Sequence, residues 1–312
     1  MNRARERKIN RKQKRKKIGR KILVFLVLVT GAQWYAFHHY NSILTGAINV
    51  KTNATQQVKP PTVDTQKEIA TLAKQYPINA VSTDGTTIAY VDSQNVLYVK
   101  DLVHNTTLTT LKNPYPVQYL EWIGNESVFV GEKEAPGVLE LKTVDANSGI
   151  ERVIHTFTGL YAQDNFKKIA YTLLTNDVYI LIGSDTDSLV YHYDTNSNLN
   201  MVYLGGRFIK NIDVSQTGNQ LYFEDYVSGT FNVLVRNQGS IQLIARNSAL
   251  ITVQGNTLYY GPVNQNGLVT AVYRYDSSTG SGVLVENLQS PTLASNIQIT
   301  QNGQVHVQTT SA

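Results

Sequence analysis

The six histidines are the side chains of this sequence best suited to bind a metal ion or to exchange a proton near neutral pH. They are His38, His39, His104, His155, His192 and His306. A zinc site needs ligands that converge on the metal, and no spacing among these residues indicates one. The chain has no cysteine, which excludes disulfides, thiolate metal sites and cysteine nucleophiles. We therefore predict no metal site and no cofactor.

The segment from Asp194 to Asn198 begins like a calcium-binding loop, with side-chain oxygens at its first, third and fifth positions. Leu199 stands where such a loop requires glycine, and Gly205 stands where it requires a bidentate glutamate. Asp and Asn side chains commonly bond to the backbone two residues further on. The sequence therefore predicts a polar turn here.

Three acids close together, Glu132, Glu134 and Glu140, are the remaining candidates for acid–base chemistry. Glycoside hydrolysis needs two carboxyl groups facing each other across a cleft, which proximity in sequence does not establish. We interpret the three as solvated loop charges. The sequence contains neither the G-x-S-x-G pattern of serine hydrolases nor the glycine patterns of nucleotide sites. No catalytic or cofactor-binding residue is predicted, and an enzyme is not expected.

The charge of this chain is unevenly distributed. Residues 1–21 carry 12 Lys and Arg and a single acid, Glu6, whereas the rest of the chain has 16 basic and 22 acidic residues. Proteins that bind nucleic acid neutralise phosphates with a basic face. The folded part, with its excess of acids, is therefore not expected to bind nucleic acid.

An apolar segment, 22–40, follows the basic run and ends in an aromatic cluster that includes Trp34 and Tyr35. About 20 residues of helix cross a bilayer, and cations remain on the cytoplasmic side. We predict a basic cytoplasmic tail (1–21) that contacts anionic lipid headgroups, and a transmembrane signal-anchor (22–40) in the cell membrane. The alternatives are a nucleic-acid-binding arm and a cleaved signal peptide, with small residues at 30–32 or 45–47.

Residues 41–77 read as a linker that contains one short helix. Thr65 and Glu68 match the capping-box pattern, and the apolar residues that follow recur at helical spacing as far as Tyr76. Pro77 is expected to end the helix. We predict that it docks on the neighbouring domain.

From residue 78 to 312 the sequence consists of short β-rich runs separated by turn residues. A strand–turn–strand unit recurs six times, at 80–90, 120–129, 163–171, 212–222, 251–259 and 297–306. A turn residue follows most of these units, at Asp101, Asp145, Asp194, Asn237 and Asp276. Repeats of about 40–50 residues are typical of propellers with four strands in each blade. We predict an all-β propeller of about six repeats, the sixth abbreviated, with either an incomplete ring or a last blade completed by N-terminal residues.

The first unit, Ser82-Thr-Asp-Gly-Thr-Thr-Ile-Ala-Tyr90, resembles the S-P-D-G-x-x-I-A-Y repeat of TolB-type (WD40-like) propellers. Residues 214–223 are similar, and the resemblance extends over roughly 78–309. Thr83 replaces the proline of the repeat, and only the first unit keeps its Asp. The resemblance implies an interaction platform, because such propellers usually serve as binding modules or as scaffolds beside a hydrolase domain.

Two functions remain open at this point. The first is a membrane-anchored binding or scaffold module outside the cytoplasm, whose partner is another envelope protein or a wall polymer. The second is an envelope enzyme, acting on glycans or peptides with acidic residues at the propeller mouth. The Asn-, Ser-, Thr- and Gly-rich loops favour the first, because these residues suit hydrogen bonding better than proton transfer.

Overall fold

The computed structural model describes residues 63–216, 220–277, 279–300 and 302–307. The predicted basic tail (1–21) and anchor (22–40) lie outside these residues. In the part of the chain that is described, no helix is both long enough and apolar enough to cross a membrane.

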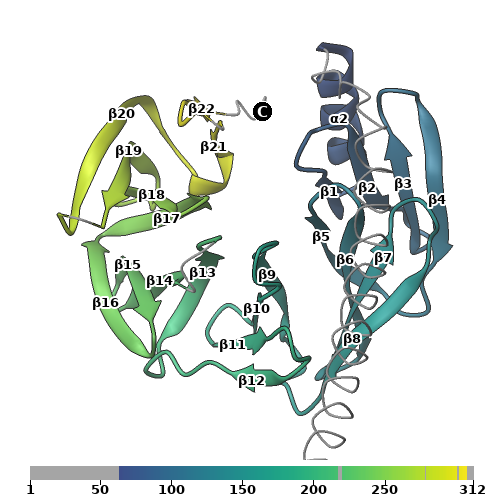
Figure 1. Ribbon diagram of the computed structural model, residues 1–312, viewed down its shortest axis with the longest axis horizontal. Coiled ribbons are helices and arrows are strands. Elements are labelled where there is room, and N and C mark those ends of the chain that lie inside the picture. Colours follow the sequence, from purple (N-terminus) through teal and green to yellow (C-terminus); the bar gives the residue numbers. More distant parts are fainter. Residues whose placement is uncertain (1–62, 217–219, 278, 301, 308–312) are drawn as a thin grey trace, which may run out of the picture. The chain divides into compact units, whose positions relative to one another are not determined.

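Antiparallel sheets of four strands follow one another along the chain, and each strand pairs with the next (Figure 1). We call these sheets blades 1 to 5. Blade 1 consists of β1 (Asn79–Val81), β2 (Thr87–Val91), β3 (Val96–Asp101) and β4 (Thr106–Lys112). Blade 2 consists of β5 (Val117–Ile123), β6 (Ser127–Ala135), β7 (Val138–Asp145) and β8 (Glu151–Phe157). Blade 3 consists of β9 (Asn165–Tyr171), β10 (Val178–Gly183), β11 (Ser188–Tyr193) and β12 (Leu199–Met201).

The later blades repeat this order. Blade 4 consists of β13 (Phe208–Val214), β14 (Leu221–Val227), β15 (Thr230–Asn237) and β16 (Ser240–Arg246). Blade 5 consists of β17 (Ser248–Gln254), β18 (Thr257–Pro262), β19 (Val269–Asp276) and β20 (Ser281–Thr292). A 3-10 turn, η1 (Ala294–Asn296), leads to a two-stranded sheet, β21 (Ile297–Ile299) and β22 (Val305–Val307), which we call blade 6. This succession of four-stranded meanders confirms the predicted all-β propeller with an abbreviated sixth repeat.

The recurring turn residues lie where the sequence placed them, at or directly after the end of the third strand of each full blade. Asp101 shows why this residue type recurs: its Oδ1 accepts hydrogen bonds from the backbone N–H groups of Val103 at 2.8 Å and His104 at 2.9 Å. Such bonds stabilise a tight turn without help from the rest of the fold. Local chemistry therefore made these turns predictable.

Five of the six predicted strand–turn–strand units are hairpins between the first two strands of a blade. The third, at 163–171, is wrong, because Asn165–Tyr171 is the single strand β9 and the hairpin turn lies beyond it, at 172–177. Asp164 and Asn165 resemble turn residues, but Asp164 ends the loop that connects blade 2 to blade 3, and Asn165 begins β9. The sequence Ile-Ala-Tyr lies in the second strand of blade 1, β2, but in the first strand of blade 3, β9.

Apolar side chains between successive blades form the core. Between blades 1 and 2 they include Ala89, Leu97 and Val130, all fully buried. Trp122 of β5 joins the same cluster and donates its indole N–H to the backbone oxygen of Ala80 in β1, at 2.8 Å. Each blade thus buries a face that it could not bury alone.

The helix α2 (Val63–Gln75) lies beside blade 1 (Figure 1). Its Glu68 forms an ion pair with Lys100 of β3, at 2.5 Å. Tyr76, just after the helix, stacks on Tyr90 of β2 with ring centroids 4.5 Å apart. The predicted docking and the end near Pro77 are therefore confirmed. The helix start predicted from the capping box at Thr65 is wrong. The helix begins at Val63, and Thr65 is buried in its first turn. A four-residue pattern of this kind also occurs by chance, so it did not mark the helix start here.

Candidate functional site

A cavity of about 650 Å³ lies where the first strands of blades 3 to 6 meet the β1–β2 turn. Its lining consists of Thr83, Lys168, Asn211, Ile212, Asp213, Leu250, Ile251, Thr252, Ala294, Ser295, Ile297, Gln298, Ile299 and Thr300. Most of these residues are hydroxyl, amide or aliphatic. Because the lining comes from several blades, the fold had to assemble it from segments far apart in the sequence.

A β-bulge in the first half of the first strand shapes this region in blades 2 to 5. The extra residues are Gln118, Lys167, Lys210 and Ile251. A bulge leaves one residue unpaired and redirects the side chains around it. Ile251 itself lines the cavity, as do Lys168 and Asn211, which directly follow their bulges. The bulges therefore help to set which side chains reach the cavity.

Polar side chains join the first strands of some neighbouring blades. The first strand of a blade has a strand partner on one side only, so its other edge needs side-chain acceptors. Tyr119 Oη accepts a hydrogen bond from Ile169 N at 2.9 Å. Asp213 Oδ2 accepts one from Val253 N at 2.6 Å. These side chains therefore connect blade 2 to blade 3 and blade 4 to blade 5.

Lys168 is the cation of the cavity lining. Its ammonium is 3.5 Å from Glu121 Oε2 on β5, and its side chain remains 39% exposed. Burial raises the pKa of Asp213, on the following blade, and the nearby positive charge of Lys168 offsets part of that rise. Lys168 therefore pairs with Glu121 and lines the same cavity as Asp213, yet its side chain remains accessible to a ligand.

The carboxylates around the cavity are already engaged by the protein itself. Asp213 Oδ1 accepts the N–H of Val214 at 2.8 Å, and Thr252 Oγ1 donates to Oδ2 at 3.3 Å, in addition to the bond from β17 described above. Glu121 Oε2 accepts the hydroxyl of Tyr119 at 2.9 Å. A general base needs a free oxygen within hydrogen-bond reach of its proton. Both oxygens of Asp213 are therefore occupied by hydrogen bonds within the protein.

The histidines of blades 1 to 3 have local partners. His104 Nδ1 is 2.7 Å from Asp101, and His192 Nε2 is 2.7 Å from Asp177. His155 packs edge-on against Phe157, with centroids 4.9 Å apart. Among the residues that the structure describes, no group of three or more His, Asp or Glu side chains is arranged to hold a metal ion.

Asp194 closes a turn, as the sequence predicted. Its Oδ1 accepts the backbone N–H groups of Asn196 and Asn198, both at 2.9 Å. Its Oδ2 accepts the side-chain amide of Asn198 at 3.0 Å. These hydrogen bonds lower the pKa of Asp194. Both oxygens are therefore used to hold the turn.

The interpretation of Glu132, Glu134 and Glu140 as loop charges is wrong. Glu132 and Glu134 lie in β6 and Glu140 lies in β7, and the side chain of Glu132 is fully buried. Lys142 explains how this burial is tolerated, because its ammonium is 2.7 Å from Glu132 and 2.5 Å from Glu151. Sequence patterns suggest that charged residues face solvent, so they do not reveal a buried ion pair between neighbouring strands such as that of Lys142 and Glu132.

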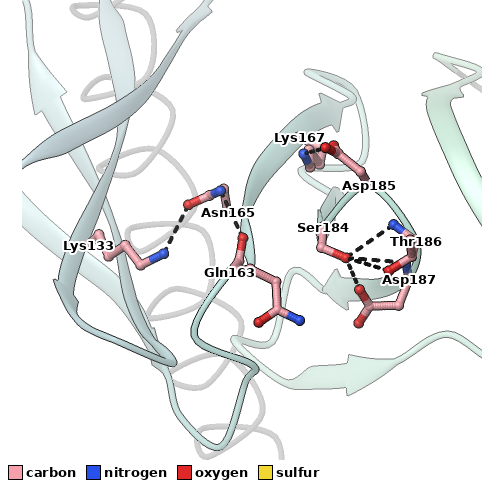
Figure 2. A network of polar contacts seen from close by, with 8 residues as sticks. All are labelled: Lys133, Gln163, Asn165, Lys167, Ser184, Asp185, Thr186 and Asp187. Carbon is pink, nitrogen blue, oxygen red and sulfur yellow. Dashed lines mark hydrogen bonds and ion pairs between the residues drawn. The ribbon is translucent and has the colours of Figure 1, made fainter.

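A smaller cavity, of about 240 Å³, lies between the segment that leads into β9 and the β10–β11 turn of blade 3. Its lining includes Lys167, Ser184 and Asp185. Beside it, Lys133 of β6 reaches across to blade 3, where its ammonium is 2.7 Å from the backbone oxygen of Ala162 and 3.2 Å from Asn165 Oδ1 (Figure 2). Because Lys133 is already surrounded by these oxygens, the cluster acts as a connection between blades.

No protein-family model matches this sequence, and no curated protein matches it. Solved structures do match. TolB from Acinetobacter baumannii is 16% identical with a TM-score of 0.48, covering 69% of this chain and 55% of that one. An oligogalacturonate lyase in complex with manganese is 12% identical with a TM-score of 0.50, covering 67% of this chain and 64% of that one.

Dipeptidyl peptidase 4 from Porphyromonas gingivalis is 9% identical with a TM-score of 0.49, covering 69% of this chain and 38% of that one. The chain thus spans less than two thirds of the length of each of these three proteins. At these low identities, what the three proteins have in common with this chain is the fold. TolB, whose repeat residues 82–90 resemble, is thus among the solved structures that match this chain.

Proposed function

We propose that this protein is a membrane-anchored binding or scaffold module of the cell envelope. In this proposal residues 22–40 span the membrane, the N-terminus is cytoplasmic and the propeller lies outside the cytoplasm. The observation that carries the proposal is the cavity of about 650 Å³ described above, which we call the central cavity. The exposed side chains of Ser295 and Gln298 and the ammonium of Lys168 are available to a ligand, whereas Asp213, the carboxylate of the lining, accepts a hydrogen bond from Val253 of the next blade.

The partner in this proposal is another envelope protein or a wall polymer. Both present many hydrogen-bonding groups, and both lie close to a module tethered to the membrane. Tethering raises the effective concentration of the cavity toward such a partner without any new contact. The alternative, an envelope enzyme, needs an acid or base free to exchange a proton with its substrate.

A reporter fused after Ala312 is expected to be active outside the cytoplasm, because the cations of residues 1–21 stay on the inner side. Alkaline phosphatase activity and green fluorescence, which report opposite sides, measure this. The same reporters fused after Lys21 serve as the cytoplasmic control. Fluorescence of the Ala312 fusion inside the cell would contradict the proposed topology, and a mature N-terminus near Gln33 or Ile48 would show a cleaved signal peptide.

A photo-crosslinking residue placed at Gln298, in the cavity lining, is expected to capture an envelope component from intact cells. Lys168→Gln should lower the yield about tenfold, because a charge-assisted hydrogen bond to the ligand is lost. The controls are exposed Lys67→Gln and the same crosslinker at Ser240, on the outer edge of blade 4. Unchanged yield would contradict binding at this cavity. Hydrolase or lyase turnover that disappears in Asp213→Asn would instead favour the enzyme.

A further inference from the structure

A second cavity, of about 360 Å³, opens between blades 2 and 3, and we call it the 2/3 groove. It is lined by Ile123, Phe129, Thr143, Arg152, Ile154, Tyr171, Thr172, Leu173, Asn176, Val178, Tyr193, Asp194, Thr195 and Ser197. These residues come from β5 to β11 and from two turns. None of them lines the central cavity, so the groove is a separate site.

The inner part of the 2/3 groove is apolar and aromatic. Phe129 is buried, and its ring meets that of Tyr171 edge-on at 6.0 Å between centroids. Ile154 of blade 2 and Val178 of blade 3 are only partly buried against the same cluster. Apolar surface left accessible at the edge of a core gains free energy when a partner covers it.

Two exposed leucines stand at the β9–β10 turn, beside this apolar surface. Leu173, which lines the groove, is 57% exposed and Leu174 is 67% exposed. The turn that carries them is well fixed: Thr172 N donates to Asp177 O at 3.0 Å, and Thr175 N donates to Thr172 Oγ1 at 3.0 Å. The leucines are therefore held out by an ordered turn, which is how a binding surface presents apolar anchors.

One free charge faces the 2/3 groove, and it is positive. Arg152 is exposed in the lining, and its guanidinium has no hydrogen-bond or ion-pair partner within the described part of the chain. The nearby acids are engaged elsewhere: Glu151 pairs with Lys142, and Asp177 pairs with His192. The carboxylate of Asp194 holds its own turn, as described above. The groove therefore complements a negative charge next to an apolar group.

We propose that the 2/3 groove binds an extended segment of a protein partner that presents an apolar side chain beside a carboxylate. The apolar side chain packs on Ile154, Val178 and Leu173, and the carboxylate pairs with Arg152. A peptide fits this surface better than a glycan does, because leucine side chains offer no hydrogen bonds to hydroxyl groups. The proposal rests on the proposed binding function and adds to it a partner class and a second contact.

The test selects short random peptides, displayed on phage, on the detergent-solubilised full-length protein. We expect enriched peptides to share an apolar residue close to Asp or Glu. Resynthesised peptides should lose about tenfold in affinity to Arg152→Gln and to Leu173→Ser, since each variant removes one contact. The same peptides with Asn or Gln in place of the acid should bind equally to wild type and to Arg152→Gln.

The matched controls are Arg246→Gln and Leu243→Ser, which change an exposed arginine and an exposed leucine on β16 and should leave affinity unchanged. The proposal is overturned if no peptides are enriched, if the enriched peptides lack a carboxylate, or if neither groove variant weakens binding. Peptides whose binding is lost in Lys168→Gln belong to the central cavity. That outcome would refute binding at the 2/3 groove while supporting the proposed function. Peptides that need Arg152, together with no capture by a crosslinker at Gln298, would support the groove and contradict the proposed function.

Discussion

Glu224→Gln is expected to stabilise the protein by about 3 kcal/mol near pH 8 and by almost nothing near pH 4.5. Glu224 lies in β14 with 8% of its surface exposed, and its Oε2 accepts the N–H of Leu250 in β17 at 2.8 Å. Burial raises the pKa of Glu224 to about 7, although the bond from Leu250 and the charge of Lys210 oppose the rise. Asp225 beside it adds to the rise.

The direction of the pH dependence follows from proton uptake. In the unfolded chain Glu224 has a pKa of 4.5, so between that pH and about 7 the folded protein keeps a proton that the unfolded chain releases. The contribution of Glu224 to stability therefore falls as the pH rises through this range. Glutamine cannot ionise, and its amide oxygen can still accept the N–H of Leu250, so the variant avoids the loss.

Chemical unfolding of the full-length chain at several pH values measures this effect. Trp34→Phe leaves Trp122, which is 2% exposed between blades 1 and 2, as the fluorescent reporter. Glu286→Gln, at an exposed position on β20, is the matched control. A Glu224→Gln effect that is the same at both ends of the pH range would contradict the argument.

The elements that the sequence predicted best are those with local causes. Asp101 and Asp194 hold their turns with bonds to residues two to four positions away, so the repeat length was visible without any tertiary structure. The helix end near Pro77 has an equally local cause. The prediction at 163–171 failed because a local sequence pattern does not specify the order of strands in a blade. Ile-Ala-Tyr lies in the second strand of blade 1 but in the first strand of blade 3.

The buried charges could not be predicted, because their causes are not local. Glu224 is buried by a strand 26 residues away that supplies its hydrogen bond. The central cavity likewise depends on bulges in separate blades, and nothing in the sequence around Lys168 distinguishes it from an ordinary surface lysine. Its proximity to Glu121, 47 residues earlier, arises only when blades 2 and 3 pack together.

Lys142→Met is expected to destabilise the protein by about 3–5 kcal/mol at neutral pH, because it leaves a buried carboxylate without its partner. Lys142 is 1% exposed in β7 and lies between Glu132 and Glu151. Burial lowers the pKa of Lys142, but its bonds to the two glutamates outweigh burial and leave the pKa above its usual value. The ammonium therefore stays charged, and its removal is not compensated by a change of protonation.

The double variant Lys142→Met with Glu132→Gln distinguishes a lost charge partner from lost packing. Burial already raises the pKa of Glu132 in the intact protein, although Lys142 opposes the rise. Without Lys142 the pKa of Glu132 rises further, so the cost of the single variant should shrink as the pH is lowered and Glu132 takes up a proton. Replacing Glu132 by Gln removes the buried charge and should recover most of the loss at neutral pH.

Unfolding of the full-length chain, followed through Trp122 as above, compares the two variants with Lys67→Met, which changes an exposed lysine of α2. If Lys142→Met costs no more than Lys67→Met, the buried ion pair does not stabilise this fold. If the double variant is no more stable than the single one, the loss comes from packing of the lysine chain between the strands of blade 2. Recovery in the double variant, together with a loss that shrinks at low pH, would assign the effect to the unpaired charge of Glu132.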